Sequence, residues 1–348
     1  MLHRLFLILF CLINVNSFAQ TKQNFDGVIN VDGFNYYAKI SPNERYIAFI
    51  KMSKQEQKNV DYDEDIYGDI WLYDSQTDSI EQLTRKTYHS KSYDNYISWS
   101  PRSDKIYFSA GGSIFEFNIQ DYKAKILLKT DLGKDHRTVF APSTNTDGSK
   151  LAYWVMKTEN NSNITHGINY LDLATGKEFE LAKKVFDPGT EVDFYNPQWA
   201  MNDSKILATF FNPEDEIQLC EIEVHSKQIK VLDQNLYTTF FKVKKDNVYY
   251  TKHDINKKES VLYKTDLTGN KKELLRVNQD AVFDVGDKGI IYFSRNDSTF
   301  EYRENNNKIS FLAKGSSPTV QGNKLVLEKW LGTGLRTKLL KMIVNQGR

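Results

Sequence analysis

The sequence predicts an all-β fold built from short antiparallel meanders, and two patterns support this prediction. Between Tyr96 and Thr130, four short segments alternate apolar and polar residues at a period of two, which suits a pleated sheet and not a helix. The links between these segments, SPRSD, GG and QDY, are short and rich in residues that form turns. A single meander cannot bury both of its faces, so other parts of the chain must pack against it.

The meander recurs along the chain, most visibly in its second strand, which follows a tight turn each time. Seven segments share this pattern, and their first apolar residues are Ile47, Ile106, Leu151, Ile206, Val248, Ile290 and Leu325. Successive copies are 35 to 59 residues apart, which brackets the roughly 40–45 residues of a β-propeller blade. We therefore predict a single domain, a seven-bladed β-propeller of four-stranded antiparallel blades. Because the last copy is short, six blades with an irregular end is the alternative.

Two motifs carry a resemblance to a known family. Residues 99–108 read WSPRSDKIYF and residues 69–84 read DIWLYDSQTDSIEQLT, with a weaker copy of the second motif over residues 169–182. These motifs are similar to those of TolB-like (WD-repeat-like) β-propellers, and they also resemble the propeller domains of prolyl and dipeptidyl oligopeptidases. The resemblance implies a propeller over nearly the whole chain. It implies no single activity, because such propellers serve as scaffolds, receptors, peptidase gates and a few sugar lyases.

The N-terminal segment has the pattern of a secretory signal peptide. A positively charged start is followed by an apolar run over residues 5–15 and by small residues before an expected cleavage after Ala19. The run is shorter than the roughly 20 residues that cross a bilayer as a helix, and Cys11 lacks the small preceding residue of a lipoprotein signal. We therefore predict a signal peptide over residues 1–19 and an exported domain over residues 20–348, periplasmic or secreted, with no transmembrane segment.

Charge and cysteine content exclude several classes of partner. The chain has 46 basic and 45 acidic residues, and removing Arg4 with the leader brings the net charge to zero, so we expect no nucleic-acid partner. Cys220 is the single cysteine after residue 19, which excludes an internal disulfide and indicates a buried structural thiol. The acidic run over residues 61–69 lacks the glycine and glutamate positions of an EF-hand loop. We predict no metal, no cofactor and a monomer.

The lengths of the links distinguish the two ends of the predicted propeller. In each blade, with strands a to d, the a–b and c–d turns lie at one end and are short. The b–c loops and the d–a crossings between blades lie at the other end and include long segments at residues 52–68, 157–167, 85–94 and 186–196. Binding sites usually lie on such loops of a rigid scaffold. We therefore predict that binding occurs at this second end, which we name the long-loop face.

Histidine, arginine, tyrosine and aspartate residues of these loops are the candidate site residues. We place His89 and His136 in d–a crossings, and His166 and His253 in b–c loops, whereas His225 falls at the opposite end. Histidine can transfer protons, and Arg137 can hold a carboxylate in bidentate fashion. The predicted ligand-binding residues are His89, Tyr93, His136, Arg137, His166, Asp193, Tyr195 and His253. If the protein is an enzyme, the catalytic candidates are His136, Arg137, His89 and Tyr93.

Three functional classes remain open at this point. The favoured class is an exported, non-catalytic binding or scaffold module of the cell envelope, which contacts an envelope protein or a glycan through the long-loop face. The chain has no G-x-S-x-G motif of the oligopeptidases. The alternative is a propeller-type polysaccharide lyase or hydrolase with a His/Arg/Tyr site at the channel mouth, since a lyase needs a base and a cation that neutralises the uronate carboxylate. The third class, suggested by the TolB-like resemblance, is a subunit of a larger secretion or transport assembly.

The two ends of the chain predict how the ring closes. The seventh unit has three strands, after which four residues remain, whereas residues 25–31, FDGVINV, have strand character and precede the first blade. An open ring would leave an unpaired strand edge. We therefore predict that residues 25–31 form the outer strand of the seventh blade.

Overall fold

The computed structural model describes residues 25–29, 33–52, 66–85, 88–89, 97–131, 136–159, 163–186, 195–211, 216–236, 240–254, 259–278, 281–332 and 337–344. Within these ranges all regular elements are β-strands. No helix of this described part is long and apolar enough to cross a membrane. The predicted signal peptide, residues 1–19, lies outside the described residues.

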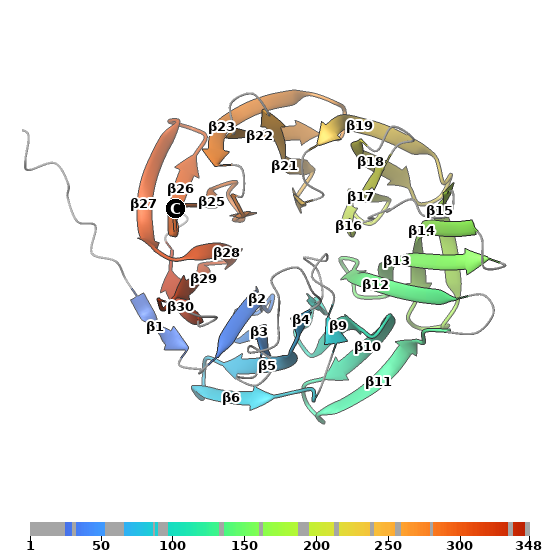
Figure 1. Ribbon diagram of the computed structural model, residues 1–348, viewed down its shortest axis with the longest axis horizontal. Helices are drawn as coiled ribbons and strands as arrows, with labels where there is room; N and C mark the ends of the chain where they lie inside the picture. The colour runs from blue at the N-terminus through green and yellow to red at the C-terminus, as the bar shows by residue number, and fades with distance from the viewer. Residues whose placement is uncertain are drawn as a thin grey trace, which may run out of the picture.

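Seven antiparallel sheets of four strands each surround a common axis (Figure 1). From the axis outward, the first three blades are β2 (Phe34–Ile40), β3 (Tyr46–Met52), β5 (Asp69–Asp74) and β6 (Ser79–Gln82); β8 (Ile97–Trp99), β9 (Lys105–Ala110), β10 (Ser113–Asn118) and β11 (Lys123–Leu128); and β12 (Arg137–Thr144), β13 (Lys150–Glu159), β14 (Asn163–Asp172) and β15 (Glu178–Phe186). The next three are β16 (Tyr195–Ala200), β17 (Lys205–Phe211), β18 (Ile217–Glu223) and β19 (Ile229–Leu236); β20 (Phe241–Lys244), β21 (Asn247–Asp254), β22 (Glu259–Asp266) and β23 (Lys271–Asn278); and β24 (Phe283–Val285), β25 (Ile291–Arg295), β26 (Ser298–Arg303) and β27 (Lys308–Lys314).

The seventh blade takes strands from both ends of the chain. Its three inner strands are β28 (Ser316–Gln321), β29 (Lys324–Trp330) and β30 (Thr337–Ile343), and its outer strand is β1 (Phe25–Ile29), which pairs antiparallel with β30. Val28 lies opposite Leu340 and Ile29 opposite Leu339. The protein is a seven-bladed β-propeller, which confirms the predicted fold class and makes the six-bladed alternative wrong.

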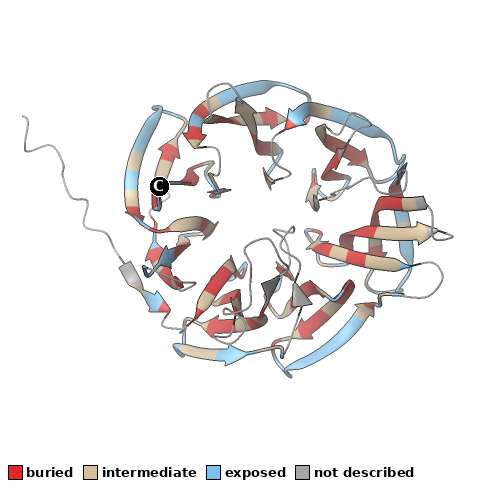
Figure 2. Ribbon diagram, viewed as in Figure 1, coloured by how far each residue is buried: buried red, intermediate tan, exposed pale blue. Residues whose placement is uncertain are grey.

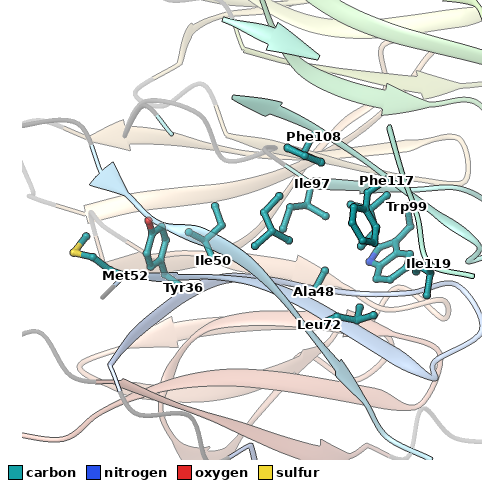
Figure 3. Packing of buried hydrophobic residues seen from close by; sticks show 12 residues of the cluster. Tyr36, Ala48, Ile50, Met52, Leu72, Ile97, Trp99, Phe108, Phe117 and Ile119 are labelled. Carbon is teal, nitrogen blue, oxygen red and sulfur yellow. The ribbon is translucent and has the colours of Figure 1, made fainter. Parts of the chain in front are cut away.

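Apolar side chains fill the spaces between neighbouring blades. One cluster of buried residues occupies each of the seven interfaces between neighbouring blades. The second strands are mostly buried, the inner strands mix buried and intermediate residues, and the outer strands are largely exposed (Figure 2). At the interface of the first two blades, Trp99 and Phe117 pack against Leu72 and Ala48 (Figure 3). Both faces of the second strand of a blade contact neighbouring blades, which explains why β3 and β9 each contain four consecutive buried residues. Cys220 is buried between the third and fourth blades, as predicted.

A small additional sheet lies outside the blades. Strand β4 (Ile66–Tyr67) in the b–c link of the first blade pairs with β7 (Tyr88–His89) in the crossing to the second blade. The pairs are Ile66 with His89 and Tyr67 with Tyr88. This sheet joins two of the long-loop segments to each other.

Candidate functional site

The predicted site residues have different positions in the fold. The backbone of His89 pairs with Ile66 in the small sheet, and the backbone of Tyr195, the first residue of β16, pairs with Thr209. Tyr93 and Asp193 lie outside the described residues. His136 is exposed, and its carbonyl oxygen accepts a hydrogen bond from the amide of Thr158 at 2.8 Å. His136 therefore presents its side chain to solvent at the start of the innermost strand of the third blade.

Arg137 is engaged inside its own blade. Its guanidinium donates to the carboxylate of Glu178, and its Nη2 lies 3.4 Å from the phenol oxygen of Tyr153. Tyr153 also donates to Glu178. Burial, and then the hydrogen bond to Glu178, raises the pKa of Tyr153, so the phenol stays protonated as the donor. The three side chains join β12, β13 and β15 across the sheet.

His166 and His253 lie in strands, so their predicted placement in b–c loops is wrong. Strand β13 extends to Glu159 and β14 begins at Asn163, which reduces the predicted loop at residues 157–167 to residues 160–162. His166 is 2% exposed and stacks on Trp154 with ring centroids 5.6 Å apart. Burial lowers the pKa of His166 to about 4, so its imidazole is neutral at pH 7. His253 lies in β21 and pairs with Ser260.

Among the candidates, Arg137, His166 and His136 have described side chains that do not form one group. Arg137 is bound within the third blade, His166 is buried beside Trp154, and His136 is exposed. Among the described residues, no group of three or more histidine, cysteine, aspartate or glutamate side chains is arranged to hold a metal ion.

The axis of the propeller holds a cavity of about 250 Å³ that the sequence reasoning missed. Inner-strand residues from all seven blades line it. Each blade contributes one lining residue at an equivalent position. In the second blade this residue is Ser98, which directly precedes Trp99, and Trp99 pairs with Ile106 near the start of the second strand. We name these seven residues the axial ring: Lys39, Ser98, Ser143, Gln198, Lys242, Asp284 and Thr319.

Within the described part of the chain, a repeated β-bulge precedes the ring position in four blades. In the first blade Tyr36 pairs with Ile50 and Lys39 pairs with Ala48, so two inner-strand residues stand opposite one residue of the partner strand. The same shift occurs before Ser143, Gln198 and Thr319. The first bulge residue has a left-handed backbone in each case: Tyr37 (φ 53°), Ala141 (φ 50°), Asn196 (φ 51°) and Ser317 (φ 48°).

The second bulge residue is proline in three of these blades, at Pro142, Pro197 and Pro318. A bulge leaves this position out of the ladder, and proline suits it because proline has no N–H to pair. Bulges change the direction of the next side chain, here the axial-ring residue. The repeated pattern of proline before a polar residue, in APS, NPQ and SPT, is the sequence signal that points to the ring.

Hydrogen bonds join the inner strands of neighbouring blades around the axis. From the second blade, the indole N–H of Trp99 donates to the carbonyl oxygen of Lys39 at 3.1 Å, and Oγ of Ser98 accepts from the amide of Thr144 at 3.2 Å. The side chain of Trp99 therefore binds the first blade, and the side chain of the adjacent Ser98 binds the third blade.

The fourth blade repeats this arrangement with a second pair of adjacent residues. Trp199 donates to the carbonyl oxygen of Ser143 at 2.9 Å. The amide of Gln198 donates to the carbonyl oxygen of Phe241 at 2.9 Å and accepts from the amide of Val243 at 3.0 Å. These bonds cross four consecutive interfaces between blades and hold the ring residues of the first five blades in position.

Comparison with known structures shows the fold alone. The chain is similar to an oligogalacturonate lyase solved with manganese (TM-score 0.70, 11% identity, 90% of each chain covered) and to an oligogalacturonate lyase from Vibrio parahaemolyticus (TM-score 0.68, 11% identity, 90% of each chain covered). It is also similar to a puromycin-hydrolysing peptidase of Mycobacterium tuberculosis (TM-score 0.64, 11% identity), covering 91% of this chain and 52% of that one. No protein-family model and no curated protein sequence matches the chain.

Proposed function

We propose that the protein is an exported, non-catalytic β-propeller of the cell envelope, which binds an envelope protein or a glycan through its long-loop face. The observation that carries this proposal is the state of the two catalytic candidates whose side chains are described, Arg137 and His136. A lyase needs a base and a cation side by side, whereas Arg137 is engaged with Glu178 and Tyr153 while His136 is exposed. Exposed polar side chains on a rigid closed ring suit a binding surface.

The signal-peptide pattern supports export of the domain. Fractionation of cells that produce the full chain should place the mature protein in the periplasm or the medium, with a new N-terminus at Gln20. Recovery of the uncleaved chain from the cytoplasm would contradict export.

Binding is tested with a matched pair of exposed histidines at opposite ends of the propeller, His136 and His225. We expect His136→Glu to weaken the capture of an envelope protein or an oligosaccharide, because the new charge lies on the long-loop face. His225→Glu should leave that capture unchanged. The immobilised domain would be presented with solubilised envelope protein, oligogalacturonate and a neutral oligosaccharide. A ligand whose binding depends on His225 and not on His136 would contradict the choice of face.

Catalysis is tested on the same material. Incubation of the domain with oligogalacturonate should yield no unsaturated product and no shorter oligosaccharide, with and without added divalent cations. If unsaturated product forms, and forms in proportion to the amount of domain, the protein is a lyase and the non-catalytic proposal is wrong.

A further inference from the structure

The axial cavity lies at the end of the propeller opposite the long-loop face. Its lining residues are at the C-terminal ends of the inner strands, where β2 ends at Ile40, β8 at Trp99 and β20 at Lys244. The a–b turns follow directly. A ligand in this cavity would therefore occupy a site separate from the one in the proposed function.

The charged residues of the cavity wall are mainly cationic. Lys39, Lys242 and Lys244 line it, and among the described residues of the lining Asp284 is the single carboxylate. Lys244 pairs with Asp287, which lies outside the lining, at 2.6 Å. An excess of one sign of charge in a cleft attracts ions of the opposite sign. The wall therefore favours an anion.

Asp284 reduces this positive field in part, and its position is fixed. Its two carboxylate oxygens accept hydrogen bonds from the amides of Val285 and Val320, each at 2.9 Å. Nζ of Lys242 lies 3.4 Å from the same carboxylate. The side chains of Lys242 and Asp284 are 18% and 12% exposed, so this pair is screened less by solvent than a surface pair.

The lysines approach the cavity from opposite sides. Lys39 belongs to the first blade and Lys242 to the fifth, which face each other across the axis (Figure 1). Ser143 and Thr319 line the same cavity and bring hydroxyl groups that both donate and accept hydrogen bonds. The volume of about 250 Å³ is just below the range of roughly 300–1,000 Å³ for ligand pockets. It suits a small ion or the end of a longer acidic chain.

We propose that the axial cavity binds a small oxyanion, a carboxylate or a phosphate, between the ammonium groups of Lys39 and Lys242, with Ser143 and Thr319 as hydrogen-bonding partners. Charge-assisted hydrogen bonds from two lysines are the strong contacts of such a site. The bonds between the inner strands hold the axial-ring backbone of the first, third and fifth blades in place before the anion binds. Binding therefore costs little conformational entropy of the backbone.

Titration calorimetry and thermal melting of residues 20–348 test this site. Sodium citrate and inorganic phosphate are the probes, and sodium chloride at matched ionic strength is the control. Citrate, phosphate or both should bind with measurable heat and raise the melting temperature above the chloride control, and the stronger of the two identifies the carboxylate or the phosphate as the source. If neither exceeds chloride, the proposal is wrong.

Single substitutions then locate the site. Lys39→Met and Lys242→Met should each weaken binding by about tenfold or more, which corresponds to the loss of one charge-assisted hydrogen bond. Lys288→Met, in an exposed turn at the same end of the propeller, is the matched control and should change the affinity by less than about twofold. If Lys242→Met unfolds the protein, Lys39→Met on the opposite blade decides the result. Equal weakening by Lys288→Met would overturn the proposal.

Discussion

Asn35 and Thr337, which are 302 residues apart in the sequence, join the first blade to the seventh through three hydrogen bonds. Oγ1 of Thr337 accepts from the backbone amide of Asn35 at 2.7 Å and donates to its carbonyl oxygen at 2.6 Å. Nδ2 of Asn35 donates to the carbonyl oxygen of Thr337 at 2.9 Å. Both residues are buried. The ring is therefore joined at this interface by polar contacts as well as by apolar packing.

Replacing Thr337 tests the value of this contact. Thr337→Val keeps the shape of the side chain but leaves the buried amide and carbonyl groups of Asn35 without the hydroxyl. We expect the free energy of unfolding to fall by about 2–3 kcal/mol, since each unsatisfied buried group costs about 1–3 kcal/mol. Urea denaturation measures the change. Thr77→Val, on an exposed turn, is the control and should change stability by less than about 0.5 kcal/mol; equal losses in the two variants would contradict a specific role for Thr337.

Removing β1 tests the closure of the ring by the N-terminal strand. A chain that begins at Gly33 lacks this strand and exposes the edge of β30, and it also loses Ile29, which is 1% exposed between the seventh and first blades. We expect unfolding at a lower urea concentration, because these contacts are lost. We also expect more light scattering, because an unpaired strand edge binds other chains.

The control for this deletion is a chain that begins at Asn24 and keeps β1. It should unfold at the same urea concentration as the chain that begins at Gln20. If the chain that begins at Gly33 also unfolds at that concentration, the pairing of β1 with β30 contributes nothing to stability.

Arg137 and His136 are neighbours in the sequence with different expected effects on stability. Arg137→Ala should lower the free energy of unfolding by about 1–2 kcal/mol, because it removes a partly exposed ion pair and leaves Tyr153 and Glu178 with fewer partners. His136→Ala should change it by less than about 0.5 kcal/mol, since the side chain is exposed. Urea denaturation of both variants decides. If the two losses are equal, the contact of Arg137 with Glu178 has no measurable value.

The sequence predicts the blades well because their signals are local. Strand alternation and turn residues lie within a few positions of each other, so the four strands between Tyr96 and Thr130 correspond to β8, β9, β10 and β11. The contact of Arg137 with Glu178 is of another kind. These residues are 41 positions apart and meet across the strands of a folded blade, so no spacing in the sequence reveals the contact.

The axial ring was missed because the bulges change the phase of the alternation. In a regular strand, residues two apart share a face. The extra residue before Ser143 shifts this register, so alternation continued from Phe140 assigns the following residues to the wrong faces. His166 was misplaced for another reason. Its polar neighbours suggested a loop, whereas β13 and β14 continue through this segment as a longer hairpin, in which His166 is buried beside Trp154.

His166 makes stability depend on pH. The ordinary pKa of histidine is 6.5, and burial lowers the pKa of His166 to about 4 in the folded protein. On acidification the unfolded chain takes up this proton near pH 6.5, while the folded protein resists it until about pH 4. The free energy of unfolding is therefore unaffected by this residue above about pH 7, and it decreases progressively as the pH falls from about 7 to about 4. The loss is at most about 3 kcal/mol.

The substitution His166→Phe isolates this contribution, because phenylalanine keeps an aromatic ring beside Trp154 and has no titrating group. Urea denaturation at several pH values between 7 and 4 should show that the wild-type protein loses more stability on acidification than the variant does. His225→Gln, which removes an exposed histidine, should follow the wild-type curve. If the wild-type and His166→Phe curves are parallel over this range, His166 is protonated as readily in the folded protein as in the unfolded chain, and its burial does not control the acid sensitivity of the propeller.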